Sequence, residues 1–205
     1  MNSFEVLIVG ARGRKKGSDG ERSRKLMLQI AAEEFAQNGF YHTKVGTIVS
    51  RAGVSQPAFY LYFSSKEAIY QELIDQFNIK LEELVGNSRL DSDIEPSSLS
   101  ERIEVGLRAI FTFFEKNQYI TKIAFIHSDQ AYKIKEGLTA KIEGNLRVEQ
   151  EYGYFRADID LSIAAEIVIS SIERLTITQL WTGKSTAEDI TKDMVQIILN
   201  GIVKK

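Results

Sequence analysis

The segment Thr43–Lys66, TKVGTIVSRAGVSQPAFYLYFSSK, constrains the fold more than any other part of the chain. Its first half places apolar side chains at i, i+3, i+4 and i+7, the spacing of one narrow helix face: Val45, Ile48, Val49 and Ala52. Thr43 is able to cap this helix and Gly53 ends it. Ser55 is suited to cap a second helix, and Pro57 fits its first turn. Two short helices joined by a glycine-containing turn form a helix-turn-helix, a motif used in DNA binding.

A wider set of residues around this motif matches a known pattern in order and spacing: Gly39, Phe40, Thr43, Val45, Ile48, Ala52, Gly53, Val54, Ser55, Phe59, Tyr60, Tyr62, Phe63, Lys66 and Glu67. Roughly residues 22 to 77 resemble the DNA-binding domain of the tetracycline-repressor (TetR) family of bacterial transcription regulators. Two positions depart from the family pattern. Gly46 replaces a residue that is commonly charged and should weaken its helix by about 1 kcal/mol relative to alanine. Val49 replaces a usual alanine where the helices cross.

Composition narrows the functional class. The chain contains no cysteine and only two histidines, His42 and His127, which lie far apart in the sequence. We therefore expect no disulfide, no metal site and no cofactor. The apolar run at residues 4 to 9 is too short to span a bilayer, and basic residues follow it instead of preceding it. The sequence thus predicts a soluble cytoplasmic protein without a membrane partner.

Charge is distributed unevenly along the chain. The net charge is −2 overall, yet residues 1–66 carry ten basic and five acidic residues, a net charge of +5. The remainder therefore carries −7. This is the arrangement expected if only the first third meets phosphate, although an accident of the solvated surface is the alternative.

Helical signals dominate the rest of the sequence, and sustained β alternation is absent. We predict an all-α fold with an N-terminal three-helix helix-turn-helix DNA-binding domain and a C-terminal helical ligand-binding and dimerisation domain. The predicted segments are a flexible basic arm (1–20), the helix-turn-helix domain (21–66), a connecting helix (67–85) and the C-terminal domain (86–205). The boundary falls in a linker at 86–98 that is rich in turn-forming residues.

Side-chain patterns also predict where individual helices begin and end. The first helix covers 21–38 and stops at Gly39. Later helices cover 99–117, 119–133, 134–151, 160–181 and 185–203. The predicted caps pair Ser64 with Glu67 and Ser185 with Glu188, and place Asp160 before the 160–181 helix.

The last two helices are apolar around more than one side. A helix at the surface of a single subunit needs only one apolar stripe, so the second face must be covered. Either each helix lies centrally in the core of one subunit, or residues 160–203 pack against a second copy. The homodimer is the favoured reading because helix-turn-helix proteins read paired half-sites symmetrically. The resemblance implies the same placement, since the final two helices form the dimer interface in the TetR family.

The predicted DNA contacts gather in the helix-turn-helix and just after it: Thr43, Lys44, Ser55, Gln56, Pro57, Ala58, Tyr60, Tyr62 and Lys66. Gln56 can pair bidentately with adenine, and Pro57 and Ala58 offer apolar contact to a thymine methyl. The resemblance assigns both tyrosines to phosphate, together with Thr43, Lys44 and Lys66. The alternative for each tyrosine is a core aromatic; Phe59 and Phe63 are expected to be core.

The basic run Arg12-Gly13-Arg14-Lys15-Lys16 precedes the first helix. Such an arm can enter the minor groove of A·T tracts, and a solvated tail is the alternative.

Aromatic and polar residues of the second domain could line a cavity for a small hydrophobic effector: Phe111, Phe114, Phe125, His127, Arg174 and Trp181. His127 and Arg174 would orient the ligand. Ordinary core packing is the alternative for the aromatics.

The preferred function is a dimeric, ligand-responsive regulator that binds a double-stranded DNA operator, most simply a repressor released by its effector. One alternative is a helical protein-interaction module without DNA binding. An enzyme is the other, disfavoured because no glycine-rich phosphate loop and no nucleophile-base set is present.

Overall fold

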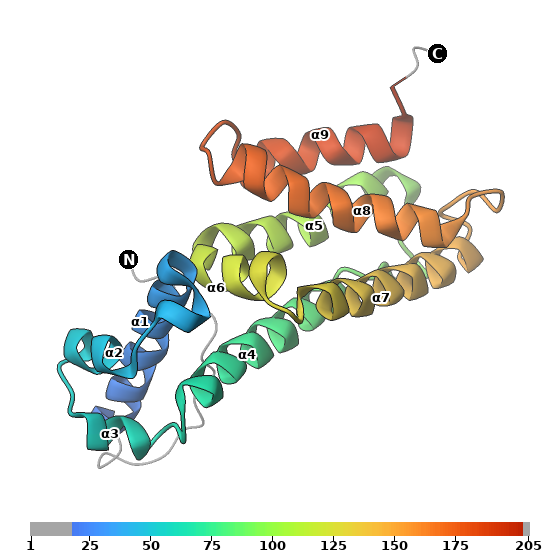
Figure 1. Cartoon of the computed structure of the whole chain (residues 1–205). Coiled ribbons are helices and arrows are strands. Elements are labelled where there is room, and N and C mark those ends of the chain that lie inside the picture. The colour runs from blue at the N-terminus through green and yellow to red at the C-terminus, as the bar shows by residue number, and fades with distance from the viewer. Residues whose placement is uncertain (1–17, 203–205) are drawn as a thin grey trace. The chain divides into compact units, whose positions relative to one another are not determined.

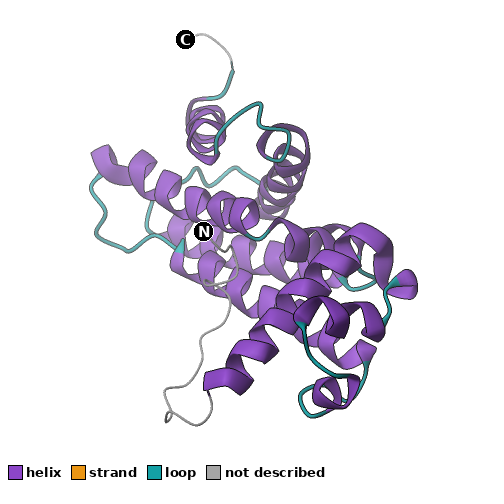
Figure 2. Ribbon diagram, turned by 90° about the vertical axis from the view of Figure 1, so that its left-hand side faces the viewer, coloured by secondary structure: helices purple, strands orange, loops and turns teal. Residues whose placement is uncertain are grey.

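Helices are the regular elements throughout residues 18–202, the part of the chain that the computed structural model describes. No strand occurs in that range, and Figure 2 accordingly shows helices and loops only. The predicted all-α fold class is confirmed. Apolar residues recur at helical spacing along the sequence, so each helix can bury one face against its neighbours.

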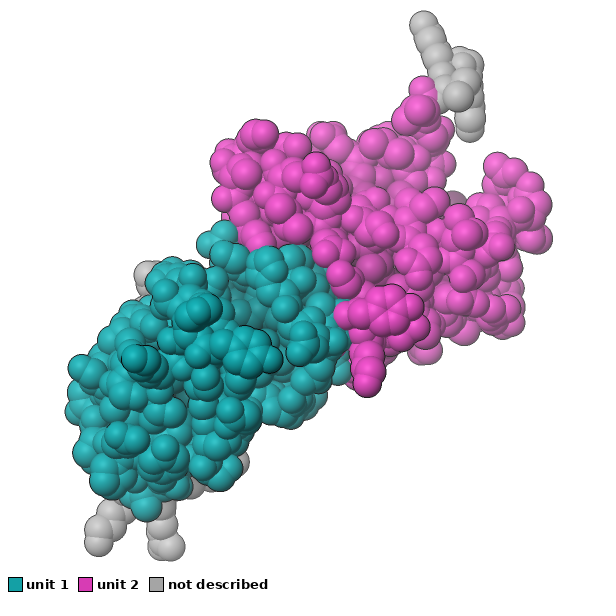
Figure 3. Space-filling view, in the orientation of Figure 1, with its two compact units in different colours: residues 1–80, 117–131 teal, residues 81–116, 132–205 magenta. Residues whose placement is uncertain are grey.

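The described residues form two compact units, coloured separately in Figure 3. The first runs to Lys80 and also includes Asn117–Ala131, and the second comprises Leu81–Lys116 and the chain from Tyr132 onward.

The units divide inside helix α4 (Lys66–Asn87) and not in the loop at 86–98 where the sequence suggested a boundary. This helix keeps an apolar residue at every fourth position, each at most 1% exposed: Ile69, Leu73, Phe77, Leu81 and Val85. An uninterrupted apolar stripe gives the helix no reason to end where one unit gives way to the next.

The first unit consists of the start of α4 and five further elements. Four of them are labelled in Figure 1: α1 (Ser18–His42), α2 (Val45–Ala52), α3 (Gln56–Tyr60) and α6 (Gln118–Thr121). The fifth is the π-helical η2 (Lys122–His127), which directly follows α6. The apolar face predicted for the first helix is buried, with Met27, Ile30, Ala31 and Phe35 between 0% and 6% exposed. Gly39 interrupts helix α1 where the sequence predicted its end: its φ of 76° and ψ of 163° are not helical and kink the chain, and a short helical stretch then continues as far as His42.

Helix α6 and η2 complete the core of the first unit by packing against α1. The Phe125 ring lies 6.2 Å from that of Phe77, and Ile120, Ile123 and Ala124 are buried beside it. The prediction of one helix over 119–133 was wrong, because Ser128 is extended (φ −74°, ψ 153°) and a turn separates η2 from the next helix. The Ser128 hydroxyl donates to the Ala124 carbonyl at 2.9 Å, a local bond of the kind that competes with helical pairing.

The second unit contains the end of α4 and six further elements: η1 (Pro96–Ser98), α5 (Leu99–Lys116), α7 (Ala131–Glu151), α8 (Leu161–Leu175), η3 (Thr176–Leu180) and α9 (Ala187–Asn200). Helix α5 packs against α9 and η3. The indole N–H of Trp181 donates to the Phe114 carbonyl at 3.4 Å and ties the end of η3 to α5. None of the described helices is long and apolar enough to cross a membrane.

The caps of α8, α4 and α9 can be compared with those predicted from the sequence. Asp160 caps α8 as predicted, accepting from the backbone N–H groups of Ser162 and Ile163 at 3.0 and 3.1 Å. The other two caps lie one residue later than predicted. Ser65, not Ser64, accepts from the Ala68 N–H at 3.2 Å at the start of α4. Thr186 and Asp189, not Ser185 and Glu188, form the capping box of α9.

Candidate nucleic-acid interface and ligand cavity

Helix α2 begins at Val45 with Lys44 at its N-cap, and Gly53 ends it in a left-handed conformation (φ 66°) as predicted. Thr43 does not cap this helix. Its hydroxyl donates to the Gly39 carbonyl at 2.8 Å, and the residue is only 2% exposed. A buried hydroxyl requires a hydrogen-bond partner, and the carbonyl at the kink in α1 supplies one. The Lys44 side chain, by contrast, is exposed.

The start of α3 is open to solvent. Ser55 caps this helix as predicted, its hydroxyl oxygen accepting from the Ala58 N–H at 3.3 Å. Gln56 and Pro57 follow in the first turn and are both exposed, whereas Ala58 is half-buried. A rigid helix start with exposed amide and ring atoms is suited to reach the edges of base pairs.

The aromatic residues after this turn separate into core and surface. Phe59 and Phe63 are 0% and 3% exposed with ring centroids 5.4 Å apart, which confirms both as core. Tyr60 is 50% exposed. Tyr62 is half-buried, and its hydroxyl comes within 2.8 Å of where a side chain on Gly20 of α1 would begin. Tyr60 therefore presents its side chain to solvent, while Tyr62 packs partly against α1.

Leu61 was absent from the predicted interface although it lies between these tyrosines. It is 82% exposed, in the turn that follows α3. The only signal for it in the sequence is its position, one residue past the end of a short helix.

Lys66, the first residue of α4, stabilises the turn between α1 and α2. Its ammonium donates to the Phe40 carbonyl at 2.8 Å and to the Thr43 carbonyl at 3.1 Å, and lies 4.3 Å from the Phe40 ring centroid. An ammonium has three N–H donors, so these carbonyls take two of them. The residue predicted only as a phosphate contact thus also organises the motif.

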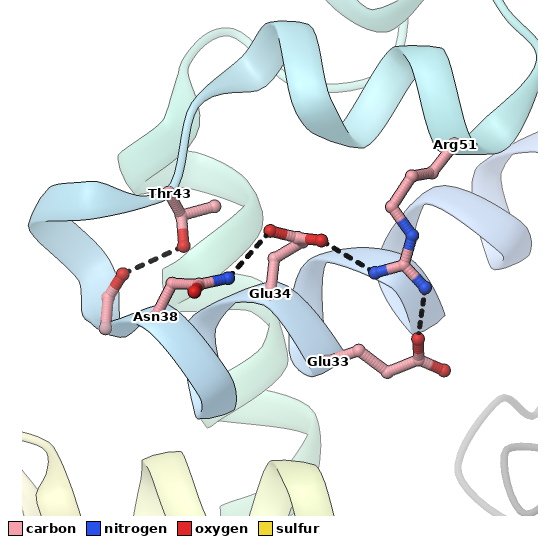
Figure 4. A network of polar contacts seen from close by, with 6 residues as sticks. Glu33, Glu34, Asn38, Thr43 and Arg51 are labelled. Carbon is pink, nitrogen blue, oxygen red and sulfur yellow. Dashed lines mark hydrogen bonds and ion pairs between the residues drawn. The ribbon is translucent and has the colours of Figure 1, made fainter.

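A polar network that the sequence analysis did not predict fixes α2 on α1 (Figure 4). The Arg51 guanidinium donates to Glu34 at 2.7 Å and to Glu33 at 2.6 Å, and the Asn38 amide donates to Glu34 at 3.0 Å. The hydrogen bond to Glu34, then that to Glu33, raises the pKa of Arg51. Arg51 is therefore engaged within the motif, although it counts toward the basic N-terminal third of the sequence. The basic run at 12–16 lies outside the described residues.

A cavity of about 510 Å³ opens in the second unit. Its walls come from the end of α4, from α5, α7, α8 and α9, and from the loop before α8. Most of the lining is aliphatic, including Ile103, Leu107, Ile110, Ile142, Leu146, Ile167, Val168 and Ile172. A largely apolar space of this size is typical of a site for a drug-sized ligand.

One edge of the cavity is polar, formed by Ser88, Asn145 and Glu149, and is called the polar edge below. The Ser88 hydroxyl and the Asn145 amide both donate to the Val85 carbonyl, at 2.8 and 3.0 Å. Glu149 is 5% exposed and accepts from the Leu90 N–H at 2.8 Å. Burial raises the pKa of this carboxyl, against the opposing effects of the Leu90 N–H and the charge of Arg89.

None of the six residues predicted to bind the effector is among those lining this cavity. Phe111 and Phe114 are fully buried within the second unit, and Phe125 belongs to the core of the first. His127 and Arg174 are exposed and Trp181 is half-buried, bonded to α5. The aromatic side chains are packed between helices, and the cavity instead lies between aliphatic helix faces.

Several isoleucines of α8 and α9 remain exposed in the single chain. Ile163 and Ile167, one turn apart on α8, are 58% and 57% exposed, and Ile197 on α9 is 56% exposed. The sequence predicted apolar surface here beyond what one subunit covers, and these values agree with that pattern.

Glu149 should make stability depend on pH in a defined direction. Because its pKa is raised in the folded state, the folded protein binds this proton more tightly than the unfolded chain. The free energy of unfolding should therefore fall as pH rises from the ordinary value of 4.5 through the raised value, and stay level above it. Glu149→Gln should remove that fall. Urea unfolding of both proteins from pH 4 to pH 8 measures the difference; a constant difference across this range would contradict the assignment.

Comparison with known proteins agrees with this geometry. Residues 27–73 match the family described as bacterial regulatory proteins, tetR family. The HTH-type transcriptional regulator YdgC of Bacillus subtilis (strain 168) is 36% identical over 188 residues, which cover 92% of this chain and 96% of that protein.

Two solved structures share the fold. The fatty acid degradation regulator FadR from Bacillus halodurans has a TM-score of 0.69 at 18% identity, covering 96% of this chain and 100% of that one. The transcriptional regulator FadR from Bacillus subtilis in complex with stearoyl-CoA has a TM-score of 0.66 at 18% identity, covering 87% and 98%.

Proposed function

Since the chain belongs to the TetR family of bacterial transcription regulators, we propose that it is a homodimeric repressor released from its operator by a small hydrophobic effector. Membership in the family makes it a DNA-binding regulator and not an enzyme. The observation that carries the proposal is the exposed first turn of α3 on a helix-turn-helix held by the buried rings of Phe59 and Phe63.

The DNA-facing surface that we propose has two kinds of contact. Gln56, Pro57 and Ala58 read base edges, because they occupy the first turn of α3. Lys44 and Tyr60 are exposed around that turn and contact phosphate, with Ser55 at the cap adding a backbone N–H. Thr43, Tyr62 and Lys66 contribute less through their side chains, since each is partly or wholly engaged inside the motif.

Selection of binding sites from a random DNA library tests the regulator as a whole. A symmetric dimer should select a palindrome whose half-site centres lie a whole number of turns apart, about 10–10.5 base pairs per turn. Binding that shows no sequence preference would argue against the proposal.

Gln56→Ala should cost about 1–3 kcal/mol on the preferred site and relax selection at one base pair, because the bidentate amide contact is lost. Lys44→Ala is the matched control on the same surface. It should weaken binding to all sequences and reduce the salt slope by about one, as expected for one lost phosphate contact. Mobility shifts on specific and mutated sites at several salt concentrations measure both effects. A uniform loss from both variants would overturn the division of roles.

The cavity of the second unit is the proposed effector site. Its aliphatic walls suit a hydrophobic or acyl-type molecule, and the FadR structure of Bacillus subtilis contains stearoyl-CoA. A ligand that binds better to a dimer with its two α3 helices wrongly spaced shifts the population away from the DNA-competent state. That state requires a separation of about 34–36 Å.

Apolar effectors should stabilise the folded protein by mass action, by about 2.7 kcal/mol at a ligand concentration 100 times the Kd, and so raise its melting temperature. Ala164→Phe places a ring in the cavity and should abolish this response while leaving operator binding intact. Thermal-shift screening of both proteins measures the effect. Stabilisation by sugars or divalent metals alone would be the contrary result.

A further inference from the structure

The hydrogen bonds already made along the polar edge leave more acceptors than donors. Ser88 lines the cavity and its hydroxyl donates its hydrogen to the Val85 carbonyl, so the hydroxyl oxygen can still accept a hydrogen bond. Asn145 directs one of its two amide N–H groups to the same carbonyl, which leaves its side-chain carbonyl oxygen as an acceptor and the second N–H as a donor. Glu149 accepts one N–H from Leu90, and a carboxylate has room for about three more bonds.

The three residues lie close together. Ser88 and Asn145 share one acceptor, and Glu149 follows Asn145 by one turn on the same face of α7. Glu149 is only 5% exposed, so water solvates its carboxylate poorly. A buried charge of this kind is strongly stabilised by a partner of opposite charge that also donates hydrogen bonds.

An anionic ligand would find no buried basic side chain in the cavity lining. Arg156 is the one basic residue in its lining, and it is exposed and bonded to Asp158 through two nitrogens, at 2.9 and 2.6 Å. Arg89 acts on Glu149 electrostatically but does not line the cavity. A carboxylate or phosphate at the polar edge would therefore face the Glu149 carboxylate and, apart from the second N–H of Asn145, only acceptors.

We propose that the effector is an amphiphile whose apolar body fills the cavity and whose protonated amine donates to Glu149, with Ser88 and Asn145 accepting its remaining N–H groups. The inference rests on the proposed role of the cavity as the effector site, and it narrows that role to cationic hydrogen-bond donors. Free fatty acids are thereby disfavoured, although their chains would fit the same aliphatic walls.

Calorimetric titration of the full-length protein with decylammonium, decanol and decanoate, each below its critical micelle concentration, tests the proposal. Decylammonium should bind tightest and decanoate weakest. Glu149→Gln should weaken decylammonium about 10- to 100-fold, the range for a lost hydrogen bond to a charged group, and leave decanol nearly unchanged. Glutamine still accepts from the Leu90 N–H, so this variant keeps the native contact. Glu151→Gln, exposed on the same helix, should behave as wild type.

Two results would overturn the inference while leaving the cavity as the effector site: decanoate binding as well as decylammonium, or decylammonium binding equally to wild type and Glu149→Gln. If none of the three compounds bound, the cavity proposal would fail together with the inference. Operator binding in a mobility shift would still show the DNA-binding function to be intact, so the two failures are distinguishable.

Discussion

Ile163→Asp should convert the protein into a folded monomer and weaken operator binding by about 100- to 10,000-fold. This is the range by which binding through two linked modules exceeds the affinity of one module alone. The side chain is 58% exposed in the single chain, so an aspartate there costs the subunit little. Across a dimer interface the same carboxylate would be buried without a partner, which strongly disfavours association. Ile163 does not line the cavity, so effector binding should survive. Sedimentation velocity and mobility shift measure the two outcomes.

Ile79→Asp is the matched control, because it places the same charge at another exposed isoleucine, on α4. It should leave the sedimentation coefficient unchanged. A wild-type protein that sediments as a monomer at micromolar concentration would contradict the dimer altogether, and a dimeric Ile163→Asp variant would place the interface elsewhere.

Lys66→Ala should lower the free energy of unfolding by roughly 1.5–3 kcal/mol, the contribution expected of hydrogen bonds to a charged group. The variant loses both bonds to the carbonyls of Phe40 and Thr43 and the contact with the Phe40 ring. Operator binding should weaken on every sequence, since the turn that places α2 would loosen. Urea unfolding measures the first effect and mobility shift the second.

The third N–H of Lys66 decides whether the residue also contacts DNA. At a temperature where the variant is folded, a lost phosphate contact should reduce the salt slope by about one. Lys44→Ala should give that reduction with no change in stability, since the Lys44 side chain makes no capping bond. An unchanged slope for Lys66→Ala would confine Lys66 to its structural role, and unchanged stability would contradict the two carbonyl bonds.

The helix-turn-helix could be predicted closely because its signals are local. A glycine in the left-handed region, a serine cap and a proline in the first turn each act within a few residues, and Gly53, Ser55 and Pro57 all do so as expected. Sequence spacing does not decide which of two adjacent residues with suitable side chains caps a helix. Ser65 and Thr186 therefore cap their helices in place of the residues just before them.

The cavity could not be predicted, because periodicity identifies apolar faces but not the distance between them. Phe114 and Ile172 both lie on apolar helix faces, yet the first is packed and the second lines open space. The pairing of Arg51 with Glu33 and Glu34 likewise depends on how closely α2 approaches α1. Such distances follow from packing of the whole unit, to which residues far apart in the sequence contribute.

The discontinuity of the first unit has a consequence for synthesis on the ribosome. Residues up to Lys80 emerge well before Asn117–Ala131, yet both stretches belong to one compact unit. Until the later stretch is made, the nascent DNA-binding unit lacks Phe125 against Phe77 and the buried side chains of Ile120, Ile123 and Ala124. At about 5–20 residues per second, translation must run for some seconds before this core is complete. The part of the chain that meets DNA is thus synthesised first but finishes folding only after Leu81–Lys116, the first part of the second unit, has been translated.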